Sequence, residues 1–116
     1  MIRPAQMALM IYKKWDVALV DLNPIKGIEI SKIRPYLVVS PNSVNTYINT
    51  IVAVPLTSIP SGNPFRTLTN QKNIEGELCF EHIKSIDKSR IVTTDGSIAK
   101  TLRTAINNLL FEFFNE

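Results

Sequence analysis

The chain has 116 residues, of which 45% are hydrophobic and 20% charged, with a formal net charge of +3. This length is enough for one folded core and too short for two, so we expect a single domain over residues 1–116, with residues 1–9 as a candidate N-terminal extension. One cysteine, Cys79, excludes an internal disulfide, and one histidine leaves no credible zinc or iron cluster, so we expect no metal site and no cofactor. The basic excess allows a polyanionic partner without requiring one.

The first apolar segment, AQMALMIY, is the stretch closest in character to a targeting signal. It is shorter than a membrane-spanning helix and leads into Lys13 and Lys14 without a small-residue cleavage pattern. We therefore expect no secretion signal, no membrane partner and, given the single cysteine, a cytoplasmic location.

The segment from Asp21 to Pro35, DLNPIKGIEISKIRP, is a polar and basic loop between two apolar runs. The run before it, Trp15–Leu22, is rich in apolar and β-branched residues and predicts a buried strand. Pro24 and Gly27 predict a loop that continues to Ile33, and Pro35 restricts the residue before it to an extended conformation. A loop of this kind, framed by two strands, is a candidate ligand site.

Further short strands follow, separated by turn residues. We expect strands over Tyr36–Ser40, Thr50–Leu56, Phe65–Leu68 and Glu77–Ile83, an exposed loop over Thr69–Gly76, and a short strand within Ser85–Val92. Pro55 inside its run indicates a sheet edge or a bulge.

After the dipeptide Asp95-Gly96, apolar residues recur at intervals of three and four up to Phe113, which predicts an amphipathic helix capped by Ser97. The pattern as a whole predicts a small, bent antiparallel sheet or barrel with one terminal helix. Phe111 and Phe114 lie off the main apolar stripe, so either the apolar face is wide or a partner covers them, a second copy being the economical choice.

Several ordered blocks resemble one known family. They are WDVALVDLNPIKGIEISKIRP, YLVVSPNSVN, VAVPLTS, NPFRTL and EHIKSIDKSR. In this order, from about Tyr12 to the terminal helix, they resemble the MazF/PemK (Kid) toxins of type II toxin–antitoxin systems. The resemblance implies an SH3-like small antiparallel β-barrel with a C-terminal α-helix, in a mainly β (α+β) chain. It further implies a homodimer, an acidic antitoxin partner, and metal-independent, sequence-specific cleavage of single-stranded mRNA that arrests growth.

The same resemblance implies the catalytic residues. Arg34 and Thr57 match the family's principal catalytic arginine and threonine, Glu29 matches a further candidate, and Glu81 with His82 stands where the family has Asp-Gln. The chain departs from the family pattern at two further positions. Trp15 replaces a usual glycine, which we interpret as a change in shape at the start of the strand. Cys79 replaces an arginine that some members use in catalysis.

RNA can be cut without a metal because its 2′-hydroxyl attacks the neighbouring phosphate, leaving a 2′,3′-cyclic phosphate and a 5′-hydroxyl. A guanidinium such as that of Arg34 stabilises charge on the phosphoryl oxygens, and the hydroxyl of Thr57 orients the reacting groups. Glu29, Glu81 and His82 are the candidates for proton transfer. Without the resemblance, we interpret Arg34 as a solvated loop charge or a salt-bridge partner, Thr57 as a turn residue, and His82 as a structural or surface residue.

Residues expected to bind RNA share a basic character or a place in a loop near the site. They are Lys26, Gly27, Lys32, Ser58, Arg66 and Lys84, with Lys88 and Arg90 as further basic residues and Tyr36, Tyr47 and Phe65 as stacking candidates. Two other functions stay open: a toxin of the same barrel that poisons DNA gyrase by binding it, as CcdB does, and a catalytically inactive RNA-binding domain.

Overall fold

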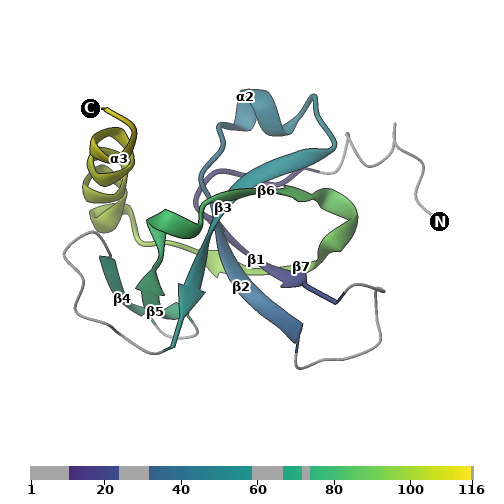
Figure 1. Ribbon diagram of the computed structural model, residues 1–116, viewed down its shortest axis with the longest axis horizontal. Helices are drawn as coiled ribbons and strands as arrows, with labels where there is room; N and C mark the ends of the chain where they lie inside the picture. The colour runs from purple at the N-terminus through teal and green to yellow at the C-terminus, as the bar shows by residue number, and fades with distance from the viewer. Residues whose placement is uncertain (1–10, 24–31, 59–66, 72–73, 116) are drawn as a thin grey trace.

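The computed structural model describes residues 11–23, 32–58, 67–71 and 74–115 (Figure 1). The strands are β1 (Asp16–Asp21), β2 (Ile33–Val38), β3 (Thr50–Thr57), β4 (Thr67–Gln71), β5 (Ile74–Leu78), β6 (Lys84–Asp87) and β7 (Ile91–Ser97). The helical elements are α2 (Asn42–Asn45), the 3-10 turns η2 (Phe80–His82) and η3 (Lys88–Arg90), and α3 (Lys100–Phe114).

The strands form one antiparallel sheet in the order β4-β5-β3-β2-β1-β7, and β6 pairs with β3 alongside this path. Figure 1 shows β1, β2, β3, β6 and β7 curling around one interior, with α3 standing to one side near β4 and β5. Over the residues described, the strand path does not return to its start, so the sheet is barrel-like but open. A mainly antiparallel β fold with a C-terminal helix confirms the predicted fold class.

Each predicted strand has a counterpart in the structure, and β7 is a strand that the prediction lacked. Strand β2 begins at Ile33 rather than Tyr36 because Ile33 pairs with Asp21 of β1. The predicted loop over Thr69–Gly76 is wrong, since residues 69–71 belong to β4 and residues 74–76 to β5, and Gln71 pairs with Ile74. Its polar composition gave no strand signal, and the pairing with the neighbouring strand decides its conformation.

Pro55 lies in a central strand, so of the two predicted alternatives, a sheet edge or a bulge, the edge is wrong. Strand β3 pairs with β2 along one side, and along the other it pairs first with β6 and then with β5. The Pro55 carbonyl accepts a hydrogen bond from the Cys79 N–H at 3.0 Å, on the side where this change of partner occurs. Because the N and C=O of a strand residue point to the same side, the missing N–H of Pro55 also faces this seam and leaves the ladder with β2 intact.

The same proline explains why the predicted strand over Glu77–Ile83 ends early. Pro55 has no N–H to donate to the Cys79 carbonyl, which instead accepts from the His82 N–H at 3.0 Å. That bond closes the turn η2, so β5 ends at Leu78.

The N-cap of helix α3 lies two residues later than predicted. Ser97 ends β7, which also contains Asp95 and Gly96, and its hydroxyl donates to Asp16 Oδ1 at 2.8 Å. The cap position is Ala99, which makes no side-chain capping bond. The predicted cap is wrong because the Ser97 hydroxyl bonds across to the residue that starts β1.

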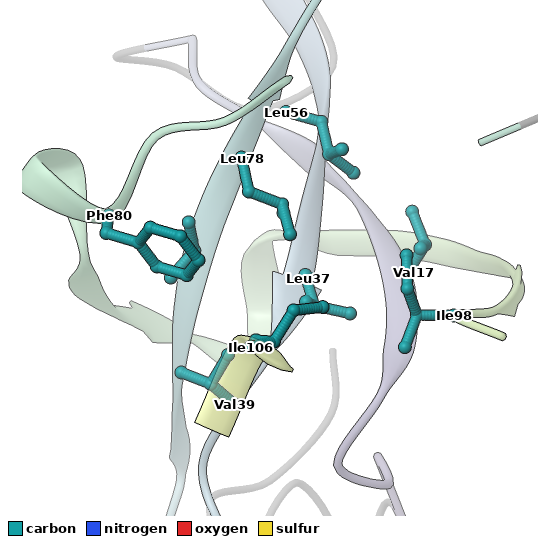
Figure 2. Close-up of a cluster of buried hydrophobic side chains, with 9 residues drawn as sticks. Val17, Leu37, Val39, Leu56, Leu78, Phe80, Ile98 and Ile106 are labelled. Carbon is teal, nitrogen blue, oxygen red and sulfur yellow. The ribbon is translucent and has the colours of Figure 1, made fainter. Parts of the chain in front are cut away.

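Two apolar clusters lie on opposite faces of the central strands. The first includes Leu37 and Leu56 from the sheet and Ile106 from α3, and Figure 2 shows these side chains converging with Phe80. The second lies inside the curl of the sheet and consists of small, β-branched and tyrosine side chains, namely Tyr12, Ala18, Val20, Tyr36, Val38, Ile51, Ala53, Ile86 and Ile91. Cys79 is buried, as predicted.

Lys88 is buried, which contradicts its expected place among the surface cations. Its Nζ donates to the backbone carbonyl of Asn45, and its N–H donates to the Asn49 carbonyl at 2.9 Å. Asn45 is itself buried, with its Nδ2 donating to the carbonyls of Tyr12 and Ser40 at 2.9 Å. Burial lowers the pKa of Lys88 below the ordinary value of 10.5, because desolvation disfavours the charged form.

Trp15, just before β1, has a φ of +81°, in the region that favours glycine. Its N–H donates to Val38 and its carbonyl accepts from Ile98, both at 2.8 Å, so the backbone is held on both sides. Lys14 Nζ and the Arg103 guanidinium lie 4.8 and 5.8 Å from its ring. Trp15, which stands where the family that the sequence resembles usually has glycine, thus adopts a backbone conformation that is easier for glycine.

Candidate functional site

Four strands place a row of side chains on the same face of the sheet. Val20 of β1 pairs with Arg34 of β2, and Tyr36 of β2 pairs with Pro55 of β3. Continuing that register by two residues sets Arg34 opposite Thr57, which in turn pairs with Glu77 of β5. Residues directly opposite in antiparallel strands point to the same face, so Arg34, Thr57 and Glu77 lie in line.

Arg34 and Thr57 line one pocket of about 320 Å³. Its walls come from adjacent stretches of β2 and β3, and the remaining lining residues are Pro35, Tyr36, Pro55, Leu56 and Ser58. The pocket therefore brings together four residues predicted from the sequence: two expected in catalysis, Ser58 expected to bind RNA, and Tyr36 as a stacking candidate.

Arg34 is exposed and extended, as expected for the residue before a proline. Its Nη1 donates to the Ile33 carbonyl at 3.0 Å, which turns the guanidinium along the strand. A guanidinium carries five donors in one plane and matches the oxygens of a phosphate or carboxylate. The open side of the pocket therefore presents a group suited to an anion.

Thr57 is half-buried at the end of β3, and its backbone is fixed by a close approach of β5. Gly76 has a φ of +152°, and a Cβ built on it would lie 2.6 Å from the Thr57 carbonyl oxygen. Only glycine fits this conformation and this distance together. The hairpin thus determines where the backbone of Thr57 lies.

Lys84 contributes a cation beside the pocket. Its Nζ lies 5.3 Å from the centre of the ring of Tyr36, a residue that lines the pocket. Tyr36 is only 5% exposed, so its ring forms part of the pocket wall rather than a free stacking platform. Tyr47, by contrast, is 81% exposed and lines neither pocket.

A second pocket, also of about 320 Å³, adjoins this region. It is lined by Asp21, Asn23, Lys84, Arg90 and by Val20, Leu22, Ser85, Ile86 and Asp87. Arg90 donates to the Asn23 carbonyl, and the Asp21 carboxylate accepts from the Asn23 N–H at 2.9 Å and from its side-chain amide at 2.6 Å. Since Lys84 lines this pocket and also contacts Tyr36, it stands at the boundary between the two.

Glu81 and His82 are exposed on η2 and line neither of these pockets. The Cys79–Pro55 hydrogen bond nevertheless anchors their turn beside the strand that carries Thr57. Lys32 is exposed just before β2, outside the pocket. Four further candidates lie outside the described residues: Lys26, Gly27, Glu29 and Arg66, as does the stacking candidate Phe65.

Glu77 is the residue of this row that sequence reasoning missed. Its side chain is only 2% exposed, although glutamate is seldom buried. In the sequence it reads as the first polar residue of an alternating run, and its place opposite Thr57 depends on a strand pairing that no local pattern reveals. Within the part of the chain that the structure describes, no three His, Cys, Asp or Glu side chains are grouped to hold a metal ion, and no helix is long and apolar enough to cross a membrane.

Comparison with known families gives a match over most of the chain. The sequence profile of the family described as "PemK-like, MazF-like toxin of type II toxin-antitoxin system" matches residues 13–114. The endoribonuclease toxin MazF of Escherichia coli K12 is 30% identical over 100 residues, covering 82% of this chain and 90% of the relative. Endoribonuclease MazF of Staphylococcus saprophyticus is 26% identical over 85 residues, covering 68% of this chain and 71% of the relative.

Solved structures share the fold. A crystal structure of MazF from Deinococcus radiodurans has a TM-score of 0.74 and 24% identity, covering 91% of this chain and 98% of the other. A mycobacterial endoribonuclease, solved in complex with its cognate antitoxin, has a TM-score of 0.73 and 21% identity, covering 89% of this chain and 92% of the other. At these identities the structural comparison supports the fold.

Proposed function

Because the chain belongs to the family of PemK-like, MazF-like toxins of type II toxin–antitoxin systems, we propose that it is an endoribonuclease that cuts single-stranded mRNA at short sequence motifs. The observation that carries this assignment is the pocket in which Arg34 of β2 and Thr57 of β3 occupy facing positions. These are the two residues that the family resemblance makes catalytic.

The proposed reaction is a transesterification within the RNA. The 2′-oxygen forms a bond to phosphorus, the bond from phosphorus to the 5′-oxygen breaks, a base removes the 2′ proton, and an acid gives a proton to the 5′-oxygen. Arg34 is exposed at the mouth of the pocket and would hold the phosphoryl oxygens through two parallel hydrogen bonds as their charge increases. Thr57 would fix the nucleophile from the opposite strand.

Three residues remain candidates for proton transfer. Glu81 and His82 lie on η2, which follows the residue, Cys79, whose N–H donates to Pro55 of β3, and Glu29 is the third candidate. We propose that a modest movement of the exposed η2 side chains on binding of RNA brings one of them to the reacting atoms, since catalytic hydrogen bonds often form only in the complex.

Binding of RNA would use the cations around the pocket. Lys84 and Lys32 flank β2, and Lys84 also reaches the second pocket, so a strand of RNA could run from one pocket to the other over this residue. Lys26, Gly27, Ser58 and Arg66 are the other proposed contacts. An acidic antitoxin would compete for the same cationic surface.

We also propose that the chain works as a homodimer. Phe111 and Phe114 are each 67% exposed on α3, and Phe113, packed edge-on against Phe114 at 5.1 Å, is 44% exposed. Apolar area of this kind is commonly covered by a partner. In the cell, cleavage of mRNA in the cytoplasm would arrest growth until the antitoxin binds.

The test is to incubate the purified protein with long single-stranded RNA in EDTA and to map the cut sites and end groups. Cuts at one short motif, with 2′,3′-cyclic phosphate and 5′-hydroxyl ends, are expected for the wild type and not for Arg34→Ala. Lys100→Ala, which removes the same charge at the exposed start of α3, is the matched control and should cut normally.

Other outcomes would favour the remaining functions. A folded protein that binds RNA but never cuts it would indicate an inactive RNA-binding domain. A protein that neither binds nor cuts RNA but inhibits DNA gyrase would indicate a CcdB-like toxin. Full activity of Arg34→Ala would show that the site is wrongly assigned.

A further inference from the structure

The contact between Lys84 and Tyr36 connects the two pockets. Lys84 is exposed and lines the second pocket, whereas Tyr36 is 5% exposed and lines the pocket of Arg34 and Thr57. The Nζ of Lys84 lies 5.3 Å from the centre of the Tyr36 ring, which is within the range of a cation–π interaction. An exposed cation is therefore held against a buried ring at the boundary between the two pockets.

The register of three strands explains why these two side chains meet. Tyr36 of β2 pairs with Pro55 of β3, and Lys84 of β6 pairs with Ala53 of β3. Because Pro55 and Ala53 are two residues apart, both pairs direct their side chains to the same face of the sheet. Ala53 contributes only a methyl group at this point, so it leaves a path for the lysine side chain to extend over the ring. The buried ring is fixed by its neighbours in the apolar cluster inside the curl, and the lysine takes its position from the ring.

An aromatic ring can hold an ammonium group without neutralising it. Within the part of the chain that the structure describes, no carboxylate pairs with the Lys84 ammonium. The ring attracts the cation through its quadrupole, so the positive charge and the N–H donors of Lys84 remain available to an anion on the solvent side. A lysine that is already held in place also loses less side-chain entropy when it binds. The contact therefore prepares Lys84 to bind a phosphate.

Arg34 lies two residues before Tyr36 in β2, about 6.6 Å along the strand, and its side chain is on the same face. This spacing is comparable to one step of an extended RNA strand. We propose that Tyr36 is a positioning residue, whose ring holds the Lys84 ammonium where it binds the phosphate next to the one held by Arg34. The inference rests on the proposed ribonuclease function. Lys84 touches the RNA, Tyr36 acts through Lys84, and no covalent step involves either residue.

The test measures, by fluorescence anisotropy, the binding of a short 2′-O-methyl RNA, which cannot be cut because its nucleophile is blocked. Tyr36→Leu removes the ring but keeps an apolar side chain, so the dissociation constant should rise about three- to tenfold. Tyr36→Phe keeps the ring and should bind within about twofold of the wild type. In a Lys84→Gln background, Tyr36→Leu should change the affinity by less than about twofold, because its effect passes through Lys84.

Nuclear magnetic resonance tests the contact in the wild type, even if Tyr36→Leu does not fold in urea-unfolding controls. The ring current of Tyr36 should shift the ε-CH2 resonances of Lys84 upfield of those of Lys100, an exposed lysine at the start of α3, and the shift should persist in the RNA complex. Resonances like those of Lys100, equal losses of affinity in Tyr36→Phe and Tyr36→Leu, or an undiminished effect of Tyr36→Leu in Lys84→Gln would overturn the role of Tyr36. A wild type that binds this RNA but leaves unblocked RNA intact would instead overturn the proposed ribonuclease function.

Discussion

Gly76→Ala is the substitution that most directly tests how the hairpin holds Thr57. The new Cβ would lie 2.6 Å from the Thr57 carbonyl oxygen, whereas ordinary contact begins near 3.4 Å, so the two strands must separate by about 0.8 Å. The backbone of residue 76, with φ of +152°, also becomes strained once a side chain is present. Strain of this kind costs about 1–3 kcal/mol, and overpacking of a fitted contact costs about as much again.

We therefore expect the free energy of unfolding to fall by roughly 2–6 kcal/mol, with a melting temperature lower by about 10 °C or more. Urea unfolding followed by circular dichroism measures the first quantity. RNA cleavage at a temperature where the variant is fully folded should also fall by about tenfold or more, because misplacement of a catalytic group by about 1 Å can cost about a hundredfold.

Gly96→Ala is the matched control. Gly96 also has a positive φ, of +73°, but it is exposed on β7 and does not line the pocket of Arg34 and Thr57. It should lose about 1–2 kcal/mol of stability and keep its cleavage rate. The reasoning would be refuted if Gly76→Ala were as stable as the wild type, or if it lost stability while its kcat stayed unchanged.

Three further predictions concern the packing and the charges. Folding lowers the pKa of Lys88, so the unfolded chain binds more protons than the folded chain just below pH 10.5. The stability of the wild type should therefore rise relative to that of Lys88→Met as the pH increases toward 10. Urea titrations measure both stabilities, and a difference between them that stays constant with pH would contradict the prediction. Lys84→Gln should weaken RNA binding and reduce the slope of the logarithm of the binding constant against the logarithm of salt concentration by about 0.7. Fluorescence anisotropy measures this slope, and an unchanged slope would show that Lys84 contacts no phosphate. Ile106→Ala, fully buried between α3 and the sheet, should cost about 2–5 kcal/mol in urea unfolding, while Phe111→Ala in dilute monomer should cost almost nothing.

The apolar strands and the terminal helix could be predicted from the sequence because their hydrophobic patterns are strong. The β4–β5 hairpin could not, since residues 69–71 and 74–76 are mostly polar and gain their conformation from the pairing of β4 with β5. The cap of α3 was mispredicted for a similar reason: Ser97 bonds to Asp16, a residue distant in sequence. Local propensity fails where a long-range partner determines the conformation.

In the candidate site too, the sequence identifies some residues, whereas their arrangement depends on long-range strand pairing. Arg34 and Thr57 could be named only through the family resemblance, because a lone arginine before a proline and a threonine in a strand are common surface features. Their facing positions follow from the register of β2 and β3, which the structure supplies. Glu77 could not be found at all from the sequence, since its place beside Thr57 depends on the partner change of β3 at Pro55.

Pro55 also protects the alignment of the pocket against slippage of β3. If the strand moved by one residue, every side chain would exchange faces, and Thr57 would point away from Arg34. The same movement would turn the nitrogen of Pro55 toward β2, where a ladder hydrogen bond needs a donor that proline lacks. Pro55 has no catalytic chemistry, but it favours a single register of β3 against β2. The geometry of the site therefore depends on it as much as on the residues that face the substrate.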